Sequence, residues 1–192
     1  MLSGESKKIA DGVIRIFCFS ILWMGIGLVS VLVFLPLVAL EYEVSGTITG
    51  LILCTPYLTS IFASMVVPKF AARVGIELTI CTAGICFGLA NIVMGFAASV
   101  ESQTSFIWIA MLSSMMIGFS SATNIVGEQA LLLRYTIKQE REKNLGKFRA
   151  SEGLGGLIAP LLGAAFYAWG GFMAVFMYVG AGFLILSPLI YR

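Results

Sequence analysis

Three uncharged polar side chains lie inside long apolar runs of this chain. Tyr57, Asn91 and Asn124 each occupy a stretch without charged residues, where a phenol or an amide can exchange hydrogen bonds with a passing solute. The same side chains often bond their own helix or hold two helices together. We therefore treat them as candidates for lining a pathway, with a structural role as the alternative.

Pro56 and Pro160 also lie in apolar runs. A proline inside a helix removes one backbone donor and bends the helix, so the freed carbonyl group needs another protein group or water in a cavity. Aligning the two runs on these prolines matches Leu53 with Leu157, as an inverted internal repeat would, although chance matches between apolar helices are common. Both prolines are pathway candidates.

Gly155, Ala159 and Gly163 follow one another at a spacing of four residues. On a helix they form a stripe of tiny side chains, which lets a neighbouring helix approach to backbone contact. Glu128 stands at the end of the preceding apolar run. A carboxyl group in a membrane span is a functional candidate by default, but this position favours an interfacial partner of a cationic side chain over a proton carrier.

The residues of this chain do not indicate an enzyme. The chain has no histidine, no phosphate-binding glycine loop and no cluster of carboxylates, and its four cysteines all fall in apolar runs. We predict no catalytic residue, no metal site, no disulfide and no cofactor. With 59% hydrophobic and 11% charged residues, the chain is far more apolar than a soluble domain, so its surroundings are the lipid bilayer and not nucleic acid.

The charge-free runs predict an all-α integral membrane protein with six transmembrane helices. Residues 1–15 form a cytoplasmic tail, and residues 16–192 form the membrane domain. Each run is close to, or longer than, the roughly 20 residues that a helix needs to cross a bilayer. The last 39 uncharged residues are too long for one helix and divide at Gly170 and Gly171. The predicted spans are 16–40, 46–67, 78–99, 106–127, 153–169 and 172–191.

Basic residues fix the orientation of these spans. With six spans, all 12 Lys and Arg residues fall on one side of the membrane and none on the other. Positive residues favour the cytoplasmic side, so we expect both termini there. The polar segment 134–149, which holds six of the basic residues, is predicted to form an amphipathic helix on the membrane surface.

The chain resembles the amino-terminal six-helix half of a major facilitator superfamily transporter, within the drug/proton antiporter and vesicular amine or polyamine transporter-like branch. The fifth span is similar to the antiporter signature G-x-x-x-G-P-x-x-G-G. The turn after the second span is similar to a degraded G-x-L-A-D-R-x-G-R-R motif. The residues at the positions of the antiporter signature are Gly155, Ala159, Pro160, Gly163 and Ala164. Those at the positions of the turn motif are Lys69, Arg73 and Gly75.

Departures from the family pattern limit what the resemblance implies. The turn has Ala72 in place of its aspartate, and the fourth span has Ser114 where a proton-linked arginine is found. The resemblance implies transport of a small organic solute by alternating access, with weak preference for organic cations, and a second six-helix half or a homodimer as partner. The rival hypothesis is a non-transporting six-helix scaffold or regulatory protein. A plasma membrane and a vesicle or vacuole membrane fit equally well.

Overall fold

The computed structural model describes residues 4–191, and the side chains of residues 12–188. Five long helices account for most of these residues, and a short 3₁₀ turn, Lys138–Glu140, connects the last two. The helices are α1 (Gly4–Glu41), α2 (Gly46–Val74), α3 (Ile76–Ala97), α4 (Gln103–Tyr135) and α5 (Arg141–Tyr191). Helix α1 thus begins within the predicted tail. All five are long and apolar enough to cross a membrane.

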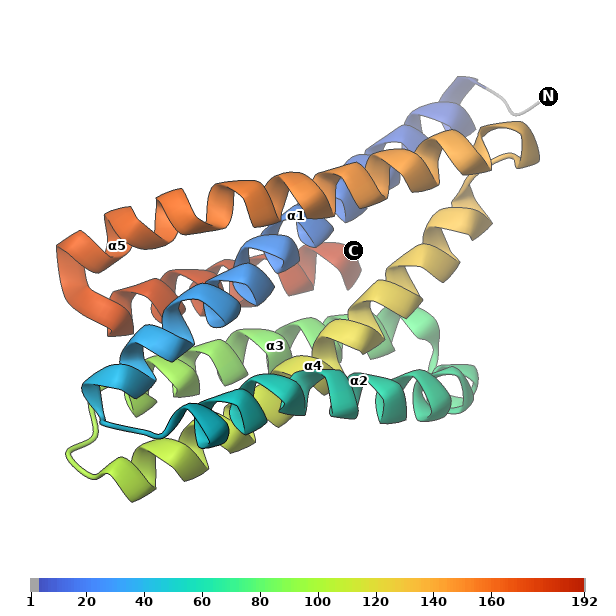
Figure 1. Ribbon diagram of the computed structural model, residues 1–192. Coiled ribbons are helices and arrows are strands. Elements are labelled where there is room, and N and C mark those ends of the chain that lie inside the picture. Colours follow the sequence, from blue (N-terminus) through green and yellow to red (C-terminus); the bar gives the residue numbers. More distant parts are fainter. Residues whose placement is uncertain (1–3, 192) are drawn as a thin grey trace.

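Two glycine positions define where the chain reverses. Helix α5 contains non-helical backbone at Gly170 and Gly171, the latter with φ of 67° and ψ of −162°, and there it folds back on itself (Figure 1). Gly75, with φ of 98°, separates α2 from α3. Side chains rarely adopt such positive φ angles, whereas glycine does so at little cost. The described residues therefore form six apolar helical segments, because α5 has a first limb, 141–169, and a return limb, 172–191.

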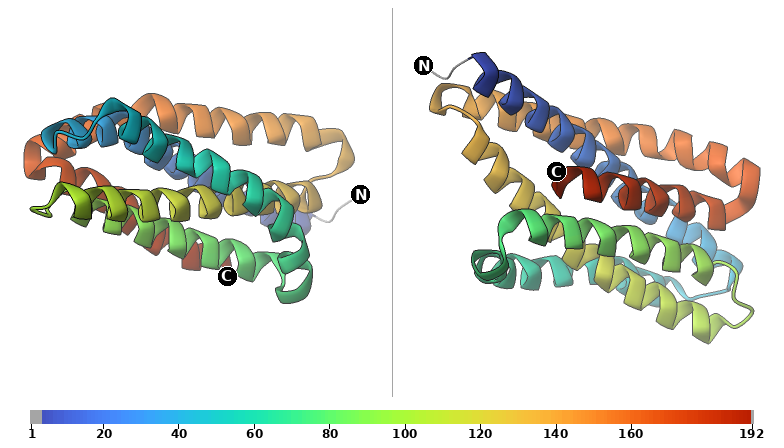
Figure 2. Two further views of the ribbon diagram at one scale, coloured as in Figure 1. Left: turned by 60° about the horizontal axis from the view of Figure 1, so that its bottom comes forward. Right: turned by 180° about the vertical axis from the view of Figure 1, so that it is seen from behind.

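The helices pack in pairs along the bundle. Helix α1 lies beside the first limb of α5, α3 lies beside the return limb, and α2 lies against α4, as the views in Figures 1 and 2 agree. The turns at residue 75 and at 136–140 lie at the same end as the N-terminus, and the turns at 42–45, 98–102 and 170–171 lie at the opposite end (Figure 1). The basic turns thus share one end of the bundle.

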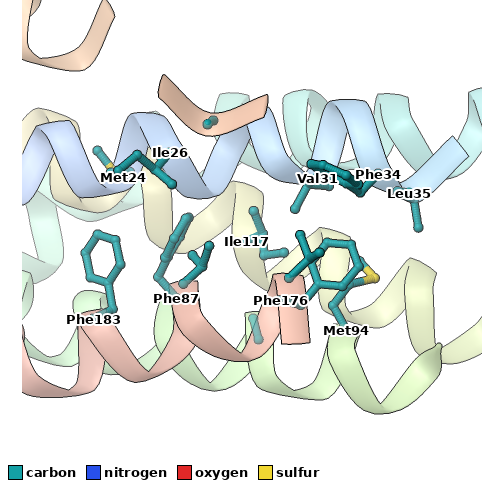
Figure 3. Packing of buried hydrophobic residues seen from close by; sticks show 14 of the residues in the cluster. Met24, Ile26, Val31, Phe34, Leu35, Phe87, Met94, Ile117, Phe176 and Phe183 are labelled. Carbon is teal, nitrogen blue, oxygen red and sulfur yellow. The ribbon is translucent and has the colours of Figure 1, made fainter. Parts of the chain in front are cut away.

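The core lies between α1, α3, α4 and the return limb of α5 (Figure 3). Phe87 of α3 and Phe183 of the return limb have ring centroids 4.6 Å apart, and both are buried. Met24 and Ile26 of α1 face these rings across the bundle (Figure 3). Close packing of such large side chains supplies dispersion contacts, which lipid alone cannot provide between helices.

The outside of the bundle is as apolar as its inside. Phe62 of α2 is 67% exposed and Leu161 of α5 is 74% exposed. A helix that is hydrophobic all round is typical of a membrane span.

The segment 134–149 differs from the prediction of a separate surface helix. Its first residues end α4, its middle forms the 3₁₀ turn, and its last nine residues begin α5 and continue into the fifth span. No proline or glycine pair interrupts the chain between Arg141 and Gly153, so nothing prevents the polar helix from continuing into the apolar one.

Candidate functional site

A cavity of about 470 Å³ opens between α1, α2 and α4. Its volume lies in the range of roughly 300 to 1,000 Å³ that is typical of small-molecule sites. Most of its lining is aliphatic, and four side chains contribute polar atoms: Tyr57, Ser60, Ser64 and Ser121. A cavity of this kind suits a solute with a large apolar body and few hydrogen-bonding groups.

One wall of the cavity is formed where α2 and α4 touch. Gly118 of α4 lies directly against the backbone of Pro56, so that a Cβ atom at Gly118 would overlap the Pro56 carbonyl oxygen. Ser60 reinforces this contact, since its Oγ lies 2.7 Å from the Pro56 oxygen and 2.9 Å from the Gly118 oxygen. The single hydroxyl proton of Ser60 is thus shared between two carbonyl groups on neighbouring helices.

The stripe of small residues on α5 faces α1. Gly155 lies against the backbone of Leu22, Ala159 is fully buried, and Gly163 lies against the ring of Phe34. Backbone-to-backbone approach at Gly155 is the contact that the four-residue spacing predicts. Pro160 and Ala164 are exposed on the other side of α5, and neither lines the cavity between α1, α2 and α4.

The pathway candidates separate into two groups. Tyr57, which is 60% exposed, and Pro56 both line the cavity. Asn91 is fully buried on α3, where its Nδ2 donates to the Phe87 carbonyl oxygen of its own helix at 2.9 Å. Asn124 is 1% exposed, lies outside the cavity lining, and neither of its amide atoms has a hydrogen-bond partner within the described part of the chain.

Glu128 pairs with no cationic side chain among the described residues 12–188, so that expectation is wrong. The residue is fully buried, and Ser20 of α1 donates a hydrogen bond to its Oε1 at 2.6 Å. The physical reason is the extent of α4, which continues to Tyr135. Glu128 therefore lies about two turns inside the helix and meets α1 instead of the headgroup region.

The turn residues Lys69 and Arg73 are exposed near the end of α2, and Gly75 closes that helix by donating its N–H to the Ala71 carbonyl oxygen at 3.0 Å. Neither cation comes near the cavity lining. Sequence reasoning missed Ser60 and Ser20, since an isolated serine in an apolar run usually bonds its own helix.

Comparison with known proteins places these features in a family context. A family model described as the Major Facilitator Superfamily matches residues 16–192. The chain is also similar to multidrug resistance protein 1 of Bacillus subtilis (strain 168), with 26% identity over 159 residues. That match covers 83% of this chain and 38% of the relative, so the chain spans less than half the length of the curated protein it matches.

Proposed function

This chain belongs to the Major Facilitator Superfamily, and from that premise we propose that it moves a small organic solute across a membrane by alternating access, as one six-helix half of a secondary transporter. The family consists of transporters and not of enzymes, and the long apolar helices make the chain an integral membrane protein. The observation that carries the proposal is the cavity between α1, α2 and α4.

The lining of the cavity points to the class of solute. Ten of its 14 lining residues are apolar, and the polar ones carry hydroxyl groups without charge. Such a surface favours an amphipathic organic molecule, and the face of the Tyr57 ring can attract a cation. We place the chain in the drug/proton antiporter and vesicular amine transporter-like branch, and its similarity to multidrug resistance protein 1 of Bacillus subtilis supports this placement.

We further propose that the six apolar segments cross the bilayer with both termini in the cytoplasm. Support comes from the basic turns, which share one end of the bundle and match the preference of Lys and Arg for the cytoplasmic side (Figure 1). The solute site is completed by a second six-helix half or by a second copy of this chain. Pro160 and Ala164, exposed on α5, are proposed to face that partner or lipid.

Uptake of a fluorescent organic cation tests the proposal. Vesicles containing the full protein are given ethidium, and initial rates are compared between wild type and Tyr57→Ala. Loss of one aromatic contact is worth about 0.5 to 1.5 kcal/mol, which corresponds to a rise in KM of roughly two- to tenfold. Phe62→Ala serves as the matched control, because Phe62 is an exposed aromatic residue of the same helix that does not line the cavity.

We expect Phe62→Ala to keep the wild-type KM at equal membrane abundance. Equal KM values for Tyr57→Ala and wild type would contradict the proposal that the cavity is part of the transport path. Absence of uptake by the wild type, with copurification of another membrane protein that Tyr57→Ala retains, would favour the scaffold hypothesis instead.

A further inference from the structure

The carboxyl group of Glu128 lies in the interior of the bundle and is not accessible to solvent. It is fully buried, and Ser20 of α1 donates the one hydrogen bond that it receives from the described residues, to Oε1 at 2.6 Å. The second oxygen, Oε2, has no partner among the described residues. The apolar cavity described above does not include this residue, and the transport proposal leaves it unused.

Asn124 extends this polar interior by one turn of α4. Residues four apart share one face of a helix, and side chains at that spacing can reach each other. Asn124 is buried like Glu128, and both its Oδ1 and its Nδ2 lack partners in the described part of the chain. Three polar atoms without a described partner therefore lie one turn apart on α4, and Ser20 contacts the carboxyl group that carries one of them. A native core rarely leaves such groups unpaired without a functional reason.

Among the residues whose side chains the structure describes, 12–188, the charged groups around this face include no compensating cation. On α5, Glu152 is the nearby charge, and its own carboxylate pairs with Arg149 at 2.7 Å. On α3, Glu77 pairs with Arg134 of α4 at 3.8 Å. On α1, Arg15 is exposed, and on α2, Lys69 and Arg73 are exposed as well.

A negative charge at Glu128 would therefore be buried without a positive partner. The desolvation of such a charge exceeds what one hydroxyl hydrogen bond returns. A bound proton removes the charge, and the resulting O–H group can donate a hydrogen bond to an acceptor one turn away on α4, Asn124 Oδ1, which has no described partner.

We propose that Glu128, Ser20 and Asn124 form a proton-binding site inside the helix bundle. The proton enters from water and binds Oε2 of the carboxylate, which becomes a neutral carboxylic acid. Release reverses the step and regenerates the carboxylate when the α1–α4 contact opens to water. Ser20 holds Oε1 throughout, which leaves Oε2, the oxygen without a described partner, to take the proton.

This site gives the transporter a way to exchange a proton for its solute, and that part of the inference rests on the proposed function. The binding of a proton to Glu128 does not depend on the proposed function. An alternating-access protein that opens the α1–α4 contact on one side of the membrane at a time would load and unload Glu128 from opposite sides.

Infrared spectroscopy of the full protein in lipid tests the site directly. At neutral pH we expect the wild type to show the C=O stretching band of an unionised carboxyl group. Glu128→Gln should lack the band. Ser20→Ala should keep the band and shift it to higher wavenumber, because the carbonyl oxygen loses its hydrogen bond while Glu128 stays in place. Glu77→Gln is the matched control and should leave the band unchanged, since Glu77 is partly exposed and pairs with Arg134.

The band also separates this inference from the transport proposal. Its absence from the wild type, or its persistence in Glu128→Gln, would overturn the proton site. Loss of the wild-type band on adding Na⁺ at constant pH would overturn it in favour of a sodium site. A wild-type band without ethidium uptake would refute the transport proposal and support the proton site. Ethidium uptake without the band would support transport and refute the proton site.

Discussion

Replacement of Gly155 by alanine perturbs a backbone-to-backbone contact between α5 and α1. The new Cβ atom would overlap the Leu22 carbonyl oxygen and lie 2.9 Å from its carbonyl carbon and 3.1 Å from the backbone nitrogen of Ile26. All three are backbone atoms, which cannot rotate away as a side chain can. Helix α1 must therefore move away from α5, and its contacts along the stripe weaken together. Overpacking of this kind costs about 1 to 3 kcal/mol.

Gly153→Ala is the control that isolates this effect. Gly153 lies two residues earlier on the same helix, and a Cβ atom there would meet nothing within 4 Å. Both substitutions change the intrinsic helix propensity equally, so the difference between them reports the contact with α1.

The assay is reversible unfolding of the full protein in mixed micelles by increasing SDS. We expect Gly155→Ala to unfold with a free energy about 1 to 3 kcal/mol lower than that of Gly153→Ala. Equal stability of the two variants would refute the backbone contact between α1 and α5.

Two further substitutions test the turns in the same assay. Gly75→Ala should destabilise the protein by about 1 to 3 kcal/mol, because a residue with a side chain is strained at the φ of 98° and ψ of 144° observed there; unchanged stability would contradict that backbone conformation. Tyr42→Phe should cost about 1 kcal/mol, because the phenol donates a hydrogen bond to the Val100 carbonyl oxygen while its ring stacks on Phe106. Burial, followed by the adjacent Glu41 carboxylate, raises the pKa of Tyr42. The contribution of Tyr42 should therefore persist up to the ordinary tyrosine pKa of about 10 and disappear as the pH rises through the raised value. Tyr42→Phe should lack this alkaline loss, and an identical alkaline loss in both proteins would exclude Tyr42 as its source.

The stripe on α5 could be predicted from sequence because its physics is local. Gly155 and Gly163 are spaced to lie on one helix face, and in a membrane a face without side chains lets a neighbouring helix approach closely. The division of the last apolar run was equally readable, since Gly170 and Gly171 permit the reversal. These features depend on the residues of a single segment.

Glu128 could not be placed correctly because its environment comes from a distant segment. Its partner, Ser20, lies 108 residues away, and a serine in an apolar run carries no sign of the helix it will face. The end of the charge-free run suggested an interface, but α4 continues past it. Ser60 was missed for the same reason, since Gly118 on another helix makes it a bridging residue.

The accessibility of Ser60 to water tests the central claim, that the space between α1, α2 and α4 is a solute pathway. In a cysteine-free form of the full protein, Ser60→Cys and Phe62→Cys are treated in membranes with a charged, membrane-impermeant maleimide. We predict that Ser60→Cys is labelled and that ethidium slows the labelling, whereas Phe62→Cys stays unlabelled in lipid. Equal protection of both positions would contradict a water-filled pathway beside α2.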